Sequence, residues 1–248
     1  MKGGNLQYFS TDSQGKPLSV VEQATNYDPR SRSWYTDAVQ AGHTRWSPIY
    51  LDFATQALVI TAASPIYDVD GNLIGVIGSA FKFSEVHEYL QPLKIGKSGI
   101  IFLIERNGLL ISTSTDDPFY KQTGNSIDRI NAMDSQNTLI KTATAFINQN
   151  YKGFGNIYDQ EIFSFIISGK KYFGYVVPIT DPNGIDWLSV TIIPESDFLF
   201  PVQIYNRSIL VLIVLTVLIA IILALLISKR YTDPIMRLTN VAREYSEG

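Results

Sequence analysis

The feature that most limits how this chain can fold is an uninterrupted apolar run at residues 208–228, SILVLIVLTVLIAIILALLIS. The run contains no charged residue, no proline and no glycine. About 21 residues at roughly 1.5 Å each match the roughly 30 Å hydrocarbon core of a bilayer. A buried helix of a soluble protein would usually carry a polar stripe, whereas this run is apolar on all sides. The sequence therefore predicts a transmembrane helix.

Basic residues are distributed unevenly around this run. Arg207 lies at its N-terminal end, and four basic residues follow its C-terminal end: Lys229, Arg230, Arg237 and Arg243. Because segments rich in Lys and Arg stay on the cytoplasmic side, we expect a cytoplasmic C-terminus and an extracytoplasmic segment from residue 1 to about 205. Residues 1–4 include no apolar segment that could direct export, so we expect the natural protein to begin upstream.

Composition limits the classes of protein to which this chain can belong. With 46% hydrophobic and 17% charged residues, the chain has enough apolar material to bury one or two cores. The formal net charge of -3 provides no broad basic field, so we expect no nucleic-acid partner. The chain has 0 Cys, which excludes disulfides, thiolate nucleophiles and cysteine-based zinc sites.

The pattern P-I-x-D-x-[DN]-G occurs twice, at residues 65–71 and 178–184. Each copy lies between two strand-like runs. The flanking runs are 57–64 and 72–83 for the first copy, and 170–177 and 185–193 for the second. Asp or Asn followed by Gly between β-rich runs indicates a hairpin, since Gly adopts the positive φ that the turn needs. The repeat predicts two antiparallel sheets, one in each half of the soluble region.

A third hairpin and three helices complete the expected fold. Residues 99–105 and 109–115 flank an Arg-Asn-Gly turn and are expected to open the second sheet. Asp28 followed by Pro29 is typical of a helix start, and Gly42 of a helix end. The expected helices are residues 29–41, 84–93 and 131–148. The predicted fold class is α+β, with two sheet-and-helix modules in tandem.

Four stretches of this region resemble the double Cache (dCache) sensor family, in which two PAS-like modules stand in tandem outside a bacterial membrane. They are residues 27–35 (YDPRSRSWY), 46–52 (WSPIYLD), the hairpin 65–83, and 94–99 (KIGKSG) with the Asn-Gly turn that follows. Residues 231–238 and Val241 are similar to the start of a HAMP domain. The resemblance implies Cache modules at 1–90 and 91–203, a transmembrane helix at 204–229, the start of HAMP at 230–248, and a homodimer in the inner membrane.

The first of these modules usually holds the ligand in the dCache family. An Arg fork, an indole N–H and phenol hydroxyls are the donors that grip a carboxylate. The residues expected to bind the ligand are Tyr27, Arg32, Trp34, Tyr35, Tyr50 and Asp52. Arg32 and Tyr35 are expected to share one helix face, because they lie three positions apart. The alternative is that Trp34 and Tyr35 are core aromatics, that Arg32 makes a surface ion pair, and that Trp46 and Asp52 close a loop.

One position departs from the amino-acid-binding motif of this family. The motif places an acidic residue late in the second hairpin strand to hold the ligand ammonium, and Ala80 stands there instead. A buried ammonium without a carboxylate costs several kcal/mol, more than the roughly 1.5–3 kcal/mol that a charge-assisted hydrogen bond contributes. The sequence therefore favours a carboxylate ligand without an α-amino group. Amino acids stay open, since Asp52, Asp37 or Asp68 could supply the charge.

Metal binding and catalysis find little support in the sequence. Residues 68–71, DVDG, contain only part of a calcium loop and are expected to form a hairpin turn. His43 and His87 are the 2 histidines and have no ligand-like spacing, so we expect no metal. No GxSxG, P-loop or GxGxxG pattern with the required context occurs, so this segment is expected to be neither an enzyme nor a cofactor-binding protein.

The sequence as a whole predicts the ligand-sensing part of a bacterial transmembrane receptor, as in chemotaxis receptors, sensor histidine kinases and receptor cyclases. A small carboxylate-bearing molecule or amino acid would bind the first module, and the signal would pass through the membrane helix to HAMP. Two alternatives stay open. The output beyond residue 248 could be a kinase or cyclase, and the extracytoplasmic part could sense a partner protein or no small molecule.

Overall fold

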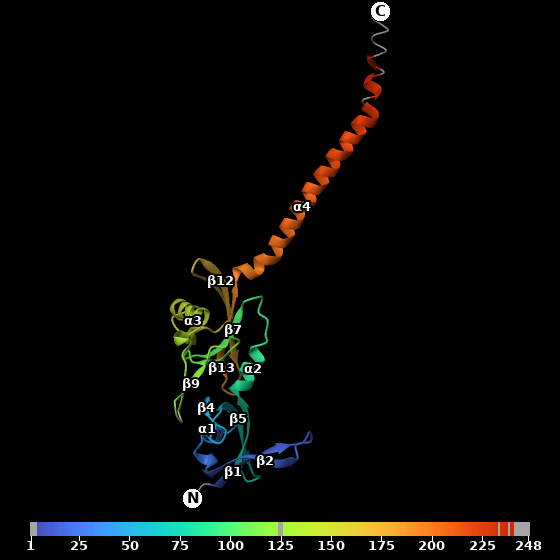
Figure 1. Ribbon diagram of the computed structural model, residues 1–248. Coiled ribbons are helices and arrows are strands. Elements are labelled where there is room, and N and C mark those ends of the chain that lie inside the picture. Colours follow the sequence, from blue (N-terminus) through green and yellow to red (C-terminus); the bar gives the residue numbers. More distant parts are fainter. Residues whose placement is uncertain (1–3, 124–125, 233, 238, 241–248) are drawn as a thin grey trace, which may run out of the picture. The chain divides into compact units, whose positions relative to one another are not determined.

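The computed structural model describes residues 4–123, 126–232, 234–237 and 239–240 (Figure 1). The chain divides into two compact units, Met1–Glu195 and Ser196–Gly248. The first unit contains two larger antiparallel sheets with helices, and the second is mainly helical. The predicted α+β class with antiparallel sheets is therefore confirmed.

The first sheet is built around one long strand. Its members are β3 (Arg45–Trp46), β4 (Tyr50–Leu51), β5 (Leu58–Tyr67) and β6 (Leu73–Lys82). β5 pairs antiparallel with the other three, and α1 (Ser33–Ala41) packs against it. The predicted hairpin at the first repeat is present, and its strands continue through Tyr67 before the turn. The buried side chains of this sheet lie on β5, whereas Ile74, Ile77 and Phe81 of β6 are exposed.

A hairpin that the sequence analysis did not predict precedes this sheet. β1 (Gly4–Thr11) and β2 (Pro17–Tyr27) pair antiparallel in a separate two-stranded sheet, with shifts of register along the pairing. The Asp12 carboxylate accepts the amides of Gln14 and Lys16, and Gly15 has a φ of 82°. An aspartate followed by glycine in the turn was the available signal.

The second sheet is larger and has the strand order β11-β12-β13-β7-β8. Its strands are β7 (Ile100–Glu105), β8 (Leu110–Thr113), β11 (Glu161–Ile167), β12 (Lys170–Thr180) and β13 (Asp186–Pro194). A two-stranded sheet of β9 (Tyr120–Thr123) and β10 (Ser126–Arg129) accompanies it. The predicted hairpins β7–β8 and β12–β13 are both present. The strand that the sequence analysis missed, β11, precedes a turn in which Ser168 and Gly169 both have positive φ.

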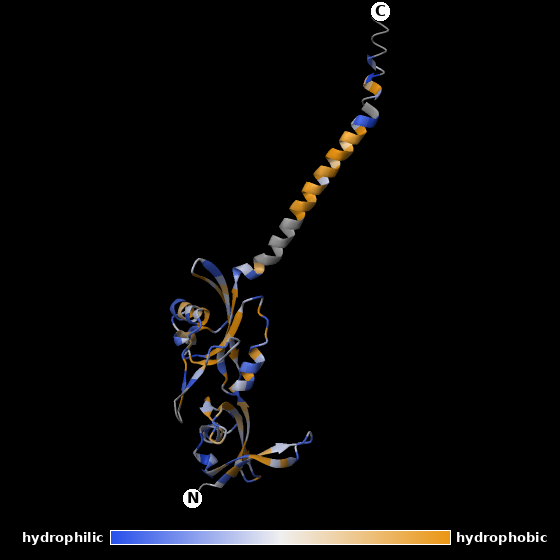
Figure 2. Cartoon of the chain, in the orientation of Figure 1, coloured by the Kyte–Doolittle hydropathy of each residue, from blue (hydrophilic) through white to orange (hydrophobic). Residues whose placement is uncertain are grey.

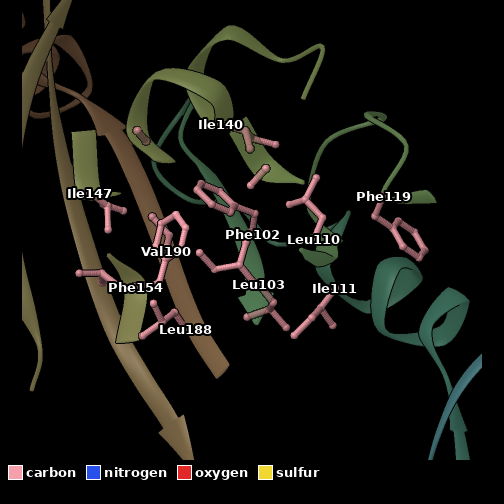
Figure 3. Packing of buried hydrophobic residues seen from close by; sticks show 14 of the residues in the cluster. Phe102, Leu103, Leu110, Ile111, Phe119, Ile140, Ile147, Phe154, Leu188 and Val190 are labelled. Atoms are coloured by element: carbon pink, nitrogen blue, oxygen red, sulfur yellow. The ribbon is translucent and has the colours of Figure 1, made fainter. Parts of the chain in front are cut away.

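The main apolar core lies against the second sheet. Phe102, Leu110, Leu188 and Val190 are fully buried there, and helix α3 (Thr138–Asn150) contributes Ile140 and Ile147 (Figure 3). Ile104 of β7 is fully buried as well. Along β13 every second side chain is buried, which is the pattern of a strand with one face on a core. Leu58 and Ile60 of β5 belong to the same cluster, so the core continues into the first sheet.

All three predicted helices differ in part from the observed ones. Residues 29–41 divide into a 3-10 turn, η1 (Pro29–Ser31), and α1, with Arg32 extended between them at φ -98° and ψ 142°. The helix predicted at 84–93 is α2 (Phe83–Leu90). The helix predicted at 131–148 was wrong at its start. Asn131 caps a separate 3-10 turn, η2 (Ala132–Asp134), and the Asn137 side chain caps α3 by accepting the amides of Leu139 and Ile140. Another 3-10 turn, η3 (Phe154–Asn156), follows.

The second unit contains the apolar helix. α4 (Glu195–Ile227) covers nearly the whole run predicted to span a membrane and is followed by a π-helical turn, η4 (Ser228–Thr232). By length and composition, Ile209–Arg237 is able to cross a membrane, and an 18-residue window within it has a mean hydropathy of 3.6 (Figure 2). Within the predicted HAMP segment, residues 234–237 are helical, whereas Asp233, Leu238 and Val241 lie outside the described residues.

Candidate functional site

A cavity of about 540 Å³ lies between the N-terminal hairpin and the first sheet. Its walls come from β1, from the end of β2 and the start of α1 with the segment between them, from β4 and the residue after it, and from β5 and β6. Its described lining is Gly4, Asn5, Leu6, Tyr8, Tyr27, Asp28, Pro29, Arg30, Trp34, Tyr50, Asp52, Thr61, Gly78 and Ala80. Four of the six predicted ligand residues, Tyr27, Trp34, Tyr50 and Asp52, are therefore brought together here.

A smaller cavity of about 210 Å³ adjoins the larger one. Its described lining is Tyr27, Ser31, Arg32, Ser33, Tyr50, Leu51 and Phe53. Tyr27 and Tyr50 belong to both linings and stand between the two spaces. Arg32 faces the smaller cavity and is absent from the described lining of the larger one, while Tyr35 belongs to the described lining of neither. Tyr35 instead packs its ring edge-on against Trp34, with centroids 5.7 Å apart.

Arg32 does not share a helix face with Tyr35, contrary to the sequence-based expectation. Because Arg32 is extended ahead of α1, its side chain leaves the helix axis and lies between two rings. Its guanidinium carbon is 5.0 Å from the Tyr27 ring centroid and 4.5 Å from that of Phe53. The Arg32 Nε atom is buried and has no hydrogen-bond partner among the described residues. Such a donor is costly to leave unpaired and favours an added acceptor.

Asp52 supplies a fixed negative charge to the larger cavity. One carboxylate oxygen, Oδ1, accepts the Thr55 amide and hydroxyl at 2.8 and 2.7 Å, and Oδ2 accepts the Tyr8 hydroxyl at 2.8 Å. Burial alone would raise the pKa of Asp52, but the hydrogen bonds from Thr55 and Tyr8 outweigh it and hold that pKa below its usual value. Among these side-chain and amide donors Oδ2 accepts only the Tyr8 hydroxyl, and a carboxylate oxygen can accept two hydrogen bonds.

Tyr8 is a site residue that the sequence analysis missed. It reaches Asp52 from β1 and lines the larger cavity, so it ties the N-terminal hairpin to the first sheet. Burial, followed by the hydrogen bond to Asp52, raises the pKa of Tyr8 above its usual value. The phenol therefore stays protonated and remains a donor. Position 8 lies outside the four stretches that resemble the family. The turn at residues 12–15 was the available signal, because it predicts the hairpin that contains Tyr8.

Four further polar side chains of the larger cavity form two hydrogen-bonded pairs. Trp34 donates its indole N–H to the Tyr27 hydroxyl at 3.2 Å. The Tyr50 hydroxyl and the Thr61 hydroxyl lie 2.7 Å apart, and burial raises the pKa of Tyr50. Aromatic rings that hold hydroxyls in this way offer both stacking surface and donors to a small polar molecule.

The second carboxylate on the cavity wall is already neutralised. Asp28 pairs with Arg30 through two contacts, Arg30 Nε to Oδ1 at 2.9 Å and Nη2 to Oδ2 at 2.8 Å. This side-chain pairing lowers the pKa of Asp28 to about 2. Asp52 is therefore the carboxylate that gives the larger cavity its net negative charge.

Small residues form part of the cavity floor on β6. Ala80 lies opposite Thr61, and Gly78 lies opposite Ala63. A Cβ atom at Gly78 would stand 2.9 Å from the Thr61 methyl carbon, so a side chain there would displace Thr61. Ala80 lines the cavity, so the position expected to carry an acidic residue does face this space. Of the three substitutes considered for that charge, Asp52 lines the cavity, whereas Asp37 and Asp68 lie elsewhere.

Several other sequence candidates have structural roles. The Trp46 indole N–H donates to Asp181 at 2.7 Å, and Trp46 is in the described lining of neither cavity. Asp68 caps its own hairpin turn by accepting the amides of Asp70 and Asn72. His87 lies with its Nδ1 atom 2.9 Å from the Thr113 carbonyl oxygen. Within the part of the chain that the structure describes, no three His, Asp or Glu side chains are grouped as metal ligands would be.

Comparison with known proteins identifies the family to which the chain belongs. The family model of the Cache domain matches residues 3–202, which is most of the chain. This chain belongs to the Cache family. The Cache domain here is therefore a sensory domain rather than a catalytic one, as the sequence resemblance implied.

Its relatives are bacterial chemotaxis receptors. The chain is 24% identical over 239 residues to the methyl-accepting chemotaxis protein PctB of Pseudomonas aeruginosa, covering 96% of this chain and 34% of that protein. It thus spans about a third of that receptor's length. The solved ligand-binding domain of PctB with L-Arg is similar at 20% identity and a TM-score of 0.43, with 70% of this chain and 63% of that chain covered. The PctC ligand-binding domain of the same organism, with GABA, aligns at 20% identity and a TM-score of 0.44, with 67% and 62% covered.

Proposed function

We propose that this chain is the sensory part of a bacterial transmembrane receptor and that its two adjoining cavities bind one small carboxylate-bearing molecule, with amino acids included. The observation that carries the proposal is the buried Arg32 Nε atom without a partner among the described residues, in a cavity that shares Tyr27 and Tyr50 with the larger one. A ligand carboxylate would accept hydrogen bonds from the Arg32 fork, and the rest of the ligand would occupy the larger cavity.

Asp52 decides whether the ligand can carry an ammonium group. The family position expected to hold that group is Ala80, which offers no charge. Asp52 lines the same cavity, and Tyr8 and Thr55 hold its carboxylate in the charged form, so we propose that it takes this role. This revises the preference, drawn from the sequence, for a ligand without an α-amino group. Tyr8, which already donates to Asp52, would then contact the ligand from the N-terminal hairpin.

The proposal is tested by calorimetry and thermal shift on the full chain in lipid nanodiscs, with amino acids, short organic acids, amines and purines as probes. L-Arg and L-Gln lead the set, because the ligand-binding domain of PctB has been solved with each. A probe at a hundred times its Kd should stabilise the domain by about 2.7 kcal/mol. Arg32→Ala should weaken binding roughly 10- to 150-fold, whereas Arg45→Ala, outside both cavities, should not.

Two results would contradict the proposal. Equal affinity in Arg32→Ala and in the unmodified chain would show that the carboxylate lies elsewhere. No stabilisation by any probe would favour the alternative of a partner-protein sensor. The ammonium role is tested separately by comparing L-alanine with propionate, whose difference in affinity should shrink in Asp52→Asn. An unchanged difference would exclude Asp52 from that role.

We further propose that α4 crosses the inner membrane with the C-terminus in the cytoplasm. We also propose that the boundary between the two Cache modules lies near residues 90 and 91, and that the receptor works as a homodimer through HAMP. The apolar segment Ile209–Arg237 and the excess of basic residues after it support the orientation. Because the chain has 0 Cys, single cysteines placed at Ser13 and Met236 can report sidedness. In cells that express the receptor, an impermeant maleimide should label Ser13→Cys before lysis and Met236→Cys only after it; the reverse order would overturn the orientation.

A further inference from the structure

The two copies of the repeated turn are built alike. In the first, Asp68 Oδ1 accepts the amides of Asp70 and Asn72 at 3.0 and 2.7 Å. In the second, Asp181 Oδ1 accepts the amides of Asn183 and Ile185 at 3.1 and 2.7 Å. Each turn therefore closes on its own aspartate through Oδ1, which leaves Oδ2 available for another donor.

The two turns differ in what their Oδ2 atom binds. Asp68 Oδ2 accepts the side-chain amide of its own Asn72 at 3.0 Å, and Val69 at the tip is fully exposed. Asp181 Oδ2 instead accepts the indole N–H of Trp46, from the first sheet, at 2.7 Å. The Trp46 backbone amide also donates to the Asn183 carbonyl at 2.9 Å. The second turn is thus held to β3 by two hydrogen bonds, one of them to a charged group.

The residue after Trp46, Ser47, is hydrogen-bonded to Thr61 in the cavity wall. The Ser47 amide donates to the Thr61 carbonyl at 2.9 Å, and the Thr61 amide donates to the Ser47 hydroxyl at 3.1 Å. Thr61 in turn lines the larger cavity and bonds to Tyr50. A shift of the cavity wall at Thr61 would therefore move β3, to which the turn is attached.

On its other side, the turn is continuous with the second sheet. It joins β12 to β13, and β13 lies between β12 and β7 in the sheet. Asp186 at the start of β13 pairs with Arg106 at 2.7 Å, which ties the base of the turn to the β7–β8 hairpin. β13 ends at Pro194, and α4 begins at the next residue.

We infer that Trp46 and the turn at residues 181–184 form the joint through which the state of the ligand cavity reaches the second sheet. The inference rests on the proposed function, because the joint would transmit the effect of a ligand bound in that site to the second sheet. A ligand that draws Thr61 or Tyr50 toward itself changes the position of β3, and the paired hydrogen bonds pass this change to β13. Since the joint belongs to a two-state balance, its effect depends on how differently the ligand contacts the two states.

The joint can be tested without any ligand, by hydrogen exchange on the full chain in nanodiscs. Gly78→Ala perturbs the cavity floor, because its Cβ would press on Thr61. We expect this substitution to speed exchange of the Asn183 and Ile185 amides roughly three- to tenfold. In Trp46→Phe, which removes the indole N–H and leaves the Asp181 turn intact, Gly78→Ala should change that exchange less than about twofold. Tyr50→Phe serves as a gentler perturbation should Gly78→Ala unfold the first sheet.

The first copy of the repeat provides the matched control. Asp68→Asn removes the same charge from the same kind of turn, and it should leave the response at Ile185 intact, whereas Asp181→Asn should remove it. The inference would be overturned if Gly78→Ala changed exchange at Ile185 equally with and without the Trp46 indole. It would also be overturned if Gly78→Ala changed exchange of the Thr61 amide and not that of Ile185.

A second experiment, in which a ligand is added, tests the joint separately from the proposed function. If L-glutamine alters hydrogen exchange at Ile185, Trp46→Phe should abolish that change. The affinity of this variant for L-glutamine should stay within about twofold of that of the unmodified chain. A retained change at Ile185 would overturn the joint. Failure of every amino acid to bind would count against the proposed function, and the Gly78→Ala comparison would still decide the joint.

Discussion

The first and second sheets are both assembled from antiparallel hairpins, yet they differ in what their faces contact. The second sheet packs fully buried side chains of β7, β8 and β13 against α3. The first sheet buries side chains on β5, exposes large apolar residues on β6, and borders a cavity of about 540 Å³. Close packing fixes one arrangement, whereas a polar cavity leaves room for a ligand and for movement. The difference indicates that stability resides mainly in the second sheet and recognition in the first.

The largest effect should come from opening the core of the second sheet. Leu188→Ala removes a fully buried side chain from β13, and the lost contacts and the remaining cavity should lower the free energy of unfolding by about 2–5 kcal/mol. Ile77→Ala, on the exposed strand β6, should cost less than about 0.5 kcal/mol. Denaturant unfolding of the full chain measures both. Similar costs for the two variants would remove the contrast between the sheets.

The carboxylate of the first sheet should have a smaller effect on stability. Asp52→Asn weakens the acceptor of three hydrogen bonds, from Thr55 and Tyr8, and should lower the free energy of unfolding by about 1–2 kcal/mol at neutral pH. Denaturant unfolding at pH 7 checks the value. A loss as large as that of Leu188→Ala would show that this site also carries the fold.

The contribution of Asp52 should depend on pH with a definite sign. Its pKa is lower in the folded chain than the usual value of about 3.9, so the folded state binds fewer protons than the unfolded state. The stabilisation is therefore fully present above about pH 4–5 and is lost as the pH falls through the folded pKa. The gap in unfolding free energy between the unmodified chain and Asp52→Asn should narrow from pH 6 to pH 3. A constant or widening gap would contradict this assignment.

The smallest effect should come from the contact that attaches the N-terminal hairpin. Tyr8→Phe removes the hydroxyl that donates to Asp52 and should cost about 0.5–1.5 kcal/mol, with faster hydrogen exchange in β1. The control is Tyr67→Phe, at the exposed end of β5, which should leave both quantities unchanged. If Tyr8→Phe behaves like Tyr67→Phe, the hairpin is held by other contacts.

Much of the fold was predictable from short stretches of sequence, and the exceptions have local causes. The three hairpins were predicted because an aspartate or asparagine and a glycine close each turn within a few residues. The start of α3 was wrong because Asn131 and Asn137 are both competent caps, and only the second begins the long helix. β1 and β2 were missed although the Asp12 turn follows the same rule, because their flanking residues do not form a strongly apolar pattern.

The candidate site was predictable in membership and less so in arrangement. Tyr27, Trp34, Tyr50 and Asp52 were predicted and do line one cavity. The sequence could not place Arg32, because a single extended residue between η1 and α1 turns its side chain into the adjoining cavity. Tyr8 could not be found either, since its partner lies 44 positions away.

By itself, the sequence determined the hairpin turns and the apolar helix α4, because a turn depends on a few neighbouring residues and a membrane-competent helix on composition over a single run. Tertiary structure alone decided that two identical kinds of turn have different surroundings: Asp68 stays on the surface, and Asp181 binds Trp46 across 135 positions. Such a contact depends on how whole sheets pack, and no local pattern around either residue carries that information.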